Sequence, residues 1–461
     1  AGPGAGGPVT GGRGAPIGDD LTKWQFWWEF HKDPYINLRE AIHASAVTTG
    51  SDEFFMGSSR RAESKDTMKP SEADIMGKVL PSLKRALDSK FQQPEAPEYL
   101  VELATDGVEA RKWVERAAVD SRTRAFSCYG LGLLAYALND LDKKRQCFEA
   151  LKSVLEESTA DGVTDRNIPV AAINGIRLIR PNPDASEKDK ALLDDCVNTL
   201  WTFYEKKVGQ SEQMIQAHVP PALASLLGRD GDADNKFKDA FSKELSGARR
   251  ANEIYQSAVI ALGLMADRSK EDKKYSQVLL KYFGDGKDEQ ARNFCLMALA
   301  KIGGDDNRNA LLQAFDKGSK ALIKPWAAIS LGVLAFEAAE ADGEGAAVDS
   351  TIGNELLRAI GDIKNDQTQS AIAVALGLCK YLEAADTLEA LLDKNKQRDE
   401  VAGYLCIGLA LMGSERSMDA IRTVVKSSIR RPGLLQQAAI ALGKLGDKGV
   451  TNDLQEMLLD E

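Results

Sequence analysis

The stretch Gln437-Ala438-Ala439-Ile440-Ala441-Leu442-Gly443-Lys444-Leu445-Gly446-Asp447, near the end of the chain, has the pattern of a helix that packs closely on a neighbour. Its alanines and Gly443 allow another helix to approach, while its leucines and Ile440 supply apolar contact. Gly446 suits the left-handed conformation in which many helices end. The stretch therefore predicts one helix of a packed array.

Similar stretches recur upstream and share one small residue, which we call the anchor. The anchors are Gly263, Ala300, Gly332, Gly377, Ala410 and Gly443, at spacings of 37, 32, 45, 33 and 33 residues. Looser matches lie at Gly132, Gly175 and Ala224. Helix pairs repeated at such periods bury their apolar faces by stacking. The pattern predicts an all-α fold, an α-α superhelix or solenoid of roughly nine to eleven helix pairs.

The motif Ala-Ala-x-Ala-Leu-Gly-x-Leu-Gly-Asp at 438–447, and Asp288-Glu289-Gln290-Ala291-Arg292 leading into 293–303, resemble HEAT-like repeats of the type found in phycobilisome lyases. The resemblance is close over 251–461 and looser over 100–250. It implies a ladder of Asp and Arg side chains at the starts of the second helices. Asp288 and Arg292 fit this ladder, whereas the unit that begins at Asp366 has Ser370 at the arginine position.

The chain divides into five predicted segments. The combination of a Gly/Pro-rich leader, a Trp-rich stretch at 23–38 and HEAT-like repeats resembles exported HEAT-repeat proteins of planctomycete-type bacteria. We expect a disordered Gly/Pro-rich leader at 1–18, a Trp-rich N-terminal capping segment at 19–47, a polar mobile loop at 48–70, divergent helical repeats at 71–250 and HEAT-like repeats at 251–461. Two interpretations of the Trp-rich segment are open. It packs over the first repeat, or it presents an aromatic patch to a partner or a sugar through Trp24, Trp27, Trp28 and Tyr35.

Composition limits the classes of partner and the compartment. A net charge of −10 argues against a broad nucleic-acid surface, and the sequence contains no apolar run long enough for a membrane span. Six cysteines without a CxxC motif favour buried, reduced thiols. The start at Ala1 followed by Gly/Pro-rich sequence suggests removal of a signal peptide, and hence a periplasmic or secreted protein. A cytoplasmic protein that lost its initiator methionine is the alternative.

Motifs for catalysis are missing from the sequence. HEAT-like hydroxylases of the deoxyhypusine type hold two irons with His-Glu pairs, but Lys32, Ala44 and Val219 follow the three histidines. HExxH, GxSxG and phosphate-loop motifs are also absent. We therefore expect no catalytic residues and no cofactor.

One acidic stretch is a calcium candidate, with Asp230, Asp232 and Asp234 alternating as at the start of a calcium loop. Its sixth position is Asn235 in place of Gly, and its twelfth is Phe241 in place of Glu. The alternative is an acidic loop that caps the helix starting near Lys236. For the chain as a whole, the sequence favours a non-catalytic scaffold that binds a protein partner. A phycobilin-lyase-like enzyme, or a small-ligand-binding protein built on the same repeats, is the alternative.

Overall fold

A computed structural model describes residues 22–38, 121–157, 165–182, 184, 186–247, 250–319, 322–343 and 347–447 of the chain. The predicted leader at 1–18, the loop at 48–70, and the repeats before residue 121 lie outside the described residues. Every regular element among the described residues is a helix, which confirms the all-α prediction. No described helix has both the length and the apolar character needed to cross a membrane.

The chain divides into two compact units. The α7–α17 unit comprises Ala46–Gly318 and Val333–Ala347, and the α18–α24 unit comprises Ala1–Ser45, Ser319–Gly332 and Val348–Glu461. The first contains α7 (Ser121–Ala137), α8 (Leu141–Glu157), α9 (Asn167–Ile179), α10 (Glu187–Glu205), α11 (Gln210–Gln216), α12 (Val219–Leu227), α13 (Lys236–Glu244), α14 (Asn252–Met265), α15 (Lys273–Asp285), α16 (Glu289–Ile302) and α17 (Asp305–Lys317).

Helix α18 (Ile323–Asp342) is divided between the two units, and its first part, up to Gly332, belongs to the α18–α24 unit. It continues through α19 (Ser350–Asp362), α20 (Asp366–Leu378), η3 (Leu382–Ala384), α21 (Ala385–Lys394), α22 (Asp399–Leu411), η4 (Glu415–Ser417), α23 (Met418–Ser427) and α24 (Pro432–Lys444). It also holds two short helices from the start of the chain, α1 (Trp24–His31) and α2 (Asp33–Ile36).

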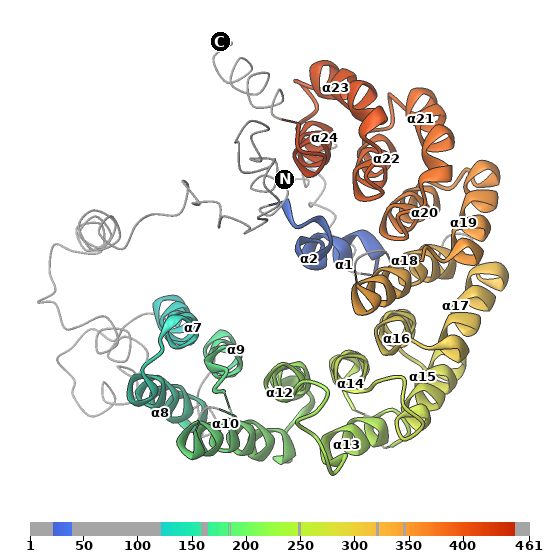
Figure 1. Cartoon of the computed structure of the whole chain (residues 1–461). Helices are drawn as coiled ribbons and strands as arrows, with labels where there is room; N and C mark the ends of the chain where they lie inside the picture. Colours follow the sequence, from blue (N-terminus) through green and yellow to red (C-terminus); the bar gives the residue numbers. More distant parts are fainter. Residues whose placement is uncertain are drawn as a thin grey trace, which may run out of the picture. The chain divides into compact units, whose positions relative to one another are not determined.

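Within each unit the helices form two layers, as expected for a HEAT-like α-solenoid (Figure 1). In the α7–α17 unit α7, α9, α12, α14 and α16 stack in sequence as an inner row, while α8, α10, α13, α15 and α17 form the outer row. In the α18–α24 unit the inner row contains α20, α22 and α24, which stack in sequence, and the outer row contains α19, α21 and α23. Each inner helix contacts its predecessor and successor, so the core is linear, as stacked repeats require.

The anchors lie where neighbouring inner helices approach most closely. A Cβ atom on Gly263 would lie 2.7 Å from Cα of Ala298, and one on Gly332 would lie 2.7 Å from Cα of Ala375. Real Cβ contacts below 3.0 Å essentially do not occur. The prediction that small residues allow this close stacking is confirmed. Gly446 has a φ of 77°, which also confirms its expected role at the end of α24.

The carboxylate–arginine ladder differs from the one that the resemblance implies. Arg292 donates a hydrogen bond from Nε to the carbonyl oxygen of Phe283 at 2.7 Å. In the α18–α24 unit, Asp366 pairs with Arg398, and the next aspartate, Asp399, accepts from Nε of Arg431 at 2.8 Å. Arg398 and Arg431 lie just before α22 and α24, where each reaches the start of the preceding inner helix. The arginine position within the helix that the resemblance implies is not used in the unit that begins at Asp366, in line with Ser370 at that position.

Buried polar and sulfur groups complete the core. Lys238 of α13 donates to both carboxylate oxygens of Asp272, at 3.0 and 2.9 Å, and both side chains are almost fully buried. All six cysteines are free and buried, which confirms the buried-thiol prediction. Burial raises the pKa of the Cys147 thiol to about 11 and that of Cys406 to about 12, because an apolar environment disfavours the thiolate.

Candidate functional site

The N-terminal segment, defined here as residues 22–38, lies along the inner helices of the α18–α24 unit (Figure 1). The spacing of its aromatic residues gives α1 one apolar side. Pro34 lies in the first turn of α2, where a backbone amide would have no partner within the helix, so its missing N–H costs nothing. Asn37 then ends α2 with a φ of 41°. The segment is separated from its contacts by more than 280 residues of sequence, and it is not part of the repeat.

Trp24 anchors the segment in the inner face. Its side chain is 1% exposed, and its indole Nε1 donates to the carbonyl oxygen of Gln367 in α20 at 3.0 Å. Its ring lies 4.9 Å from the ring of Tyr404 in α22, at an interplanar angle of 52°. A buried indole needs a partner for its N–H, and the packed ring contributes apolar area. The inner face meets both requirements.

A second indole donates in the opposite direction. Nε1 of Trp326 in α18 donates to the carbonyl oxygen of Thr22 at 3.0 Å. Beside Trp24, Nε2 of Gln25 donates to Oε1 of Glu400 at 2.6 Å, and the same oxygen accepts from Nε2 of Gln367 at 3.1 Å. Side chains of both the segment and the inner helices therefore donate these hydrogen bonds, and a main-chain carbonyl oxygen on each side accepts one.

The electrostatics of the contact keep Tyr404 neutral. Burial raises the pKa of its phenol strongly, the carboxylates of Glu29 and Glu400 raise it further, and a hydrogen bond with Gln437 opposes them. Glu29 comes from the segment and Glu400 from α22, so the two acidic groups approach the phenol from opposite partners. The carboxylate of Glu400 stays accessible at the start of its helix.

The remainder of the segment packs largely on itself. The rings of Trp27 and His31 stack with centroids 4.8 Å apart, and Nδ1 of His31 lies 2.7 Å from the carbonyl oxygen of Trp27. Trp28 stacks on Tyr35 at 5.9 Å. At the far end, Leu38 takes the place of a repeat neighbour, because a Cβ on the anchor Gly443 would lie 2.8 Å from Cδ1 of Leu38.

The sequence predicted that these aromatic residues pack, but it placed them wrongly. Trp24, Trp27, Trp28 and Tyr35 are all buried, yet the segment contacts α18, α20, α22 and α24 instead of the first repeat. The expected location of the cap is therefore corrected. The interpretation as a partner-binding patch stays a prediction, and it requires the segment to leave this position.

The residues that receive the segment, together with Gln437 beside Tyr404, fall at two repeat positions that the sequence analysis did not notice. Trp326, Tyr404 and Gln437 each lie six residues before an anchor, at Gly332, Ala410 and Gly443 respectively. Gln367 and Glu400 each lie ten residues before an anchor. These positions recur on the same face of successive inner helices. Large aromatic and amide side chains at them are the sequence signal that marks this face; we call it the inner groove, with Gln367, Glu400, Tyr404, Gln437 and Trp326 as its residues.

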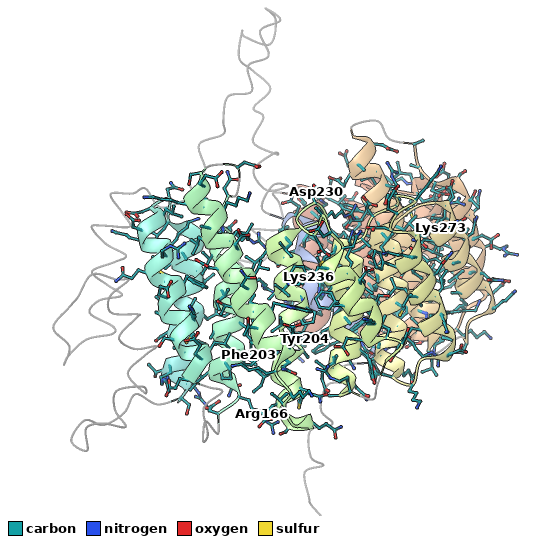
Figure 2. All side chains as sticks on the ribbon, turned by 90° about the horizontal axis from the view of Figure 1, so that it is seen from below. Arg166, Phe203, Tyr204, Asp230, Lys236 and Lys273 are labelled. Atoms are coloured by element: carbon teal, nitrogen blue, oxygen red, sulfur yellow. The ribbon has the colours of Figure 1, made fainter. Side chains whose placement is uncertain are left out.

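The calcium candidate is arranged as a helix cap. Asp230 lies on the loop between α12 and α13, and Lys236 begins α13 (Figure 2). Asp232 is buried, and its carboxylate accepts from the backbone N–H of Phe237 at 3.1 Å and of Lys238 at 2.9 Å. Asp230 and Asp234 are exposed. Within the described ranges no group of three or more His, Cys, Asp or Glu side chains is arranged to hold a metal.

A separate cavity of about 1010 Å³ lies between α7 and α9 in the α7–α17 unit. Its lining combines aromatic, aliphatic and amide side chains: Ser121, Arg122, Ala125, Phe126, Tyr129, Asp165, Asn167, Val170, Ala171 and Asn174. Phe126 is 72% exposed, and Tyr129, Leu133 and Tyr136 are exposed further along the same helix. This apolar side of α7 was not singled out by the sequence analysis.

Comparison with solved structures finds several crystal structures of the karyopherin Kap121p. One of Kap121p itself gives a TM-score of 0.39 at 14% identity and covers 94% of this chain and 48% of that chain. Kap121p bound to Pho4p gives 0.38 at 12%, with 83% and 49% covered, and the complex with the SUMO protease Ulp1p gives 0.37 at 13%, with 94% and 48%. The chain thus spans about half the length of these structures. No protein-family profile and no curated protein matches the sequence.

Proposed function

We propose that the chain is a non-catalytic scaffold that binds a protein partner in the inner groove of the α18–α24 unit. One observation carries the proposal: the groove already holds a polypeptide segment from a distant part of the sequence. It does so through a buried indole, hydrogen bonds to main-chain carbonyl oxygens, and a carboxylate that accepts two amide hydrogen bonds. Aromatic side chains buried in pockets are typical anchors of protein interfaces.

The geometry favours a peptide segment over a small molecule as the ligand. The two indole-to-carbonyl bonds join Trp24 to Gln367 and Trp326 to Thr22, so the start of the docked segment is held from both α18 and α20. Leu38 extends the contact to Gly443 on α24. The receiving positions therefore span four inner helices, which matches helix-in-groove recognition of a polypeptide.

The test is purification of a native complex on the full chain, with two matched variants. Glu400→Arg places a charge where Glu400 now accepts two amide hydrogen bonds, whereas Glu383→Arg makes the same change on the exposed turn η3. We expect a stoichiometric partner with wild type and with Glu383→Arg, and at least a tenfold loss of affinity with Glu400→Arg. A partner retained equally by both variants would place the binding surface elsewhere.

The cavity between α7 and α9 supports the second candidate, a small-ligand-binding protein, including the phycobilin-lyase-like activity that the repeat resemblance suggests. Its size matches that of ligand pockets, and Phe126 and Tyr129 offer aromatic faces beside Asn167 and Asn174. This candidate predicts an absorbing species that co-purifies with the native chain and is lost in Phe126→Ser. The scaffold proposal predicts a purified chain whose visible spectrum is empty.

A further inference from the structure

The N-terminal segment contacts the inner groove mainly through side chains, as a bound peptide would, whereas a neighbouring repeat helix packs backbone against backbone. Neighbouring inner helices approach until an added Cβ on Gly332 would meet backbone atoms, whereas the segment meets the anchor Gly443 only through the side chain of Leu38. The printed hydrogen bonds between the segment and the inner helices each involve a side chain. Its outward side is open, with Phe30 71% exposed. The segment therefore buries its tryptophans and keeps the side that carries Phe30 open.

The fit between the segment and the groove is incomplete. Oε1 of Gln25 is buried and has no hydrogen-bond partner among the described atoms. A buried acceptor without a partner lowers the affinity of the contact that buries it. Among the described residues, the carboxylate of Glu400 meanwhile accepts hydrogen bonds from the neutral amides of Gln25 and Gln367, although a cationic donor would form a stronger bond. A different occupant can therefore bind more tightly than the chain's own segment.

We propose that residues 22–38 are a built-in competitor, which occupies the inner groove within the same chain until a protein partner displaces it. The displacing partner presents a short amphipathic helix with an indole in the place of Trp24 and a cationic side chain in the place of Gln25, next to Glu400. This inference rests on the proposed function, because it assigns the regulation and the partner chemistry of the same groove. The segment seated there shows which chemistry fits.

The experiment measures binding of a dye-labelled peptide of residues 22–38 to the full chain by fluorescence anisotropy. Trp24→Ala combined with Trp28→Ala in the full chain removes two buried rings of the resident segment and vacates the groove. We expect the peptide to bind this variant at least tenfold more tightly than wild type. A Gln25→Arg peptide should bind the vacated groove more tightly than the parent peptide, and this gain should disappear when Glu400→Ala is added.

Each alternative outcome has a distinct meaning. Equal binding to wild type and to the vacated variant would show that the segment does not compete, and would leave the proposed groove intact. No binding to either chain, with unchanged circular dichroism, would refute the proposed groove as well. A Gln25→Arg peptide no tighter than the parent would overturn the proposed partner chemistry.

Two controls keep the test decisive. If the double alanine variant does not fold, Trp24→Phe with Gln25→Ala replaces it, because this pair retains an aromatic ring and removes both segment-side donors. Sedimentation velocity tests whether the segment in the groove comes from the same chain or from a second copy of it. A wild-type dimer that becomes monomeric in the vacated variant would show that the segment docks on its neighbour, and would overturn competition within one chain.

Discussion

Gly377 faces the next inner helix so closely that an added methyl group has no room. A Cβ on Gly377 would lie 2.5 Å from the carbonyl oxygen of Gly408 and 2.8 Å from Cβ of Leu411. Helix α22 would have to shift by roughly 1 Å, and overpacking of this kind costs about 1–3 kcal/mol. Replacing glycine by alanine inside a helix otherwise gains up to about 1 kcal/mol. We therefore expect Gly377→Ala to lower the free energy of unfolding by up to about 2 kcal/mol.

The matched control is Gly361→Ala in the last turn of α19, where an added Cβ would meet no atom within 4 Å. This variant should be unchanged or more stable by up to about 1 kcal/mol. Urea titration of the full chain, followed by far-ultraviolet circular dichroism, gives both values from the transition midpoints. Midpoints that rise equally in the two variants would refute the close packing of α20 on α22 at Gly377.

Three further predictions concern the α7–α17 unit. Lys238→Met should lower the free energy of unfolding by about 3–5 kcal/mol, because it leaves the carboxylate of Asp272 buried and unpaired; adding Asp272→Asn should recover part of this loss in urea titration. The raised pKa of Cys147, about 11 against an ordinary 9.0, means that the unfolded chain loses this proton first as the pH rises. Its contribution to stability is therefore complete below pH 9.0 and lost as the pH rises to about 11. Cys147→Ala should reduce the fall in melting temperature between pH 9.0 and about 11, and a fall equal to that of wild type would contradict this. Millimolar calcium should leave the melting temperature unchanged, because the carboxylate of Asp232 is engaged by backbone amides; an upward shift that Asp232→Ala abolishes would reveal a calcium site.

The repeat could be predicted from the sequence because its rule is local. Close stacking requires a small residue at one position of each inner helix, so this position can be recognised within the sequence of a single helix. The structure places Gly263, Gly332 and Gly377 where neighbouring inner helices approach most closely. The helix end at Gly446 is equally local, since glycine adopts a positive φ without steric cost.

The position of the N-terminal segment could not be predicted in the same way. Its aromatic pattern shows that one side of α1 must be buried, but the surface that buries it lies more than 300 residues away at Gln367 and Tyr404. Amphipathic spacing shows which side of a helix is buried and how much apolar area that side offers, but it does not show which other helices cover it. The expectation of a cap on the first repeat was a choice among equivalent inner helices, and the wrong one.

What distinguishes those inner helices is their departure from the repeat. At the position six residues before the anchor, α20 carries Ala371, whereas α18 carries Trp326 and α22 carries Tyr404. Trp326 donates to the carbonyl oxygen of Thr22 and Tyr404 packs against Trp24, whereas α20 receives the indole of Trp24 through the carbonyl oxygen of Gln367. A perfectly regular array would offer the segment equal sites along its whole length. The rings of Trp326 and Tyr404 at this repeat position therefore mark the docking site, and the same position is where substitutions should alter which partner the groove accepts.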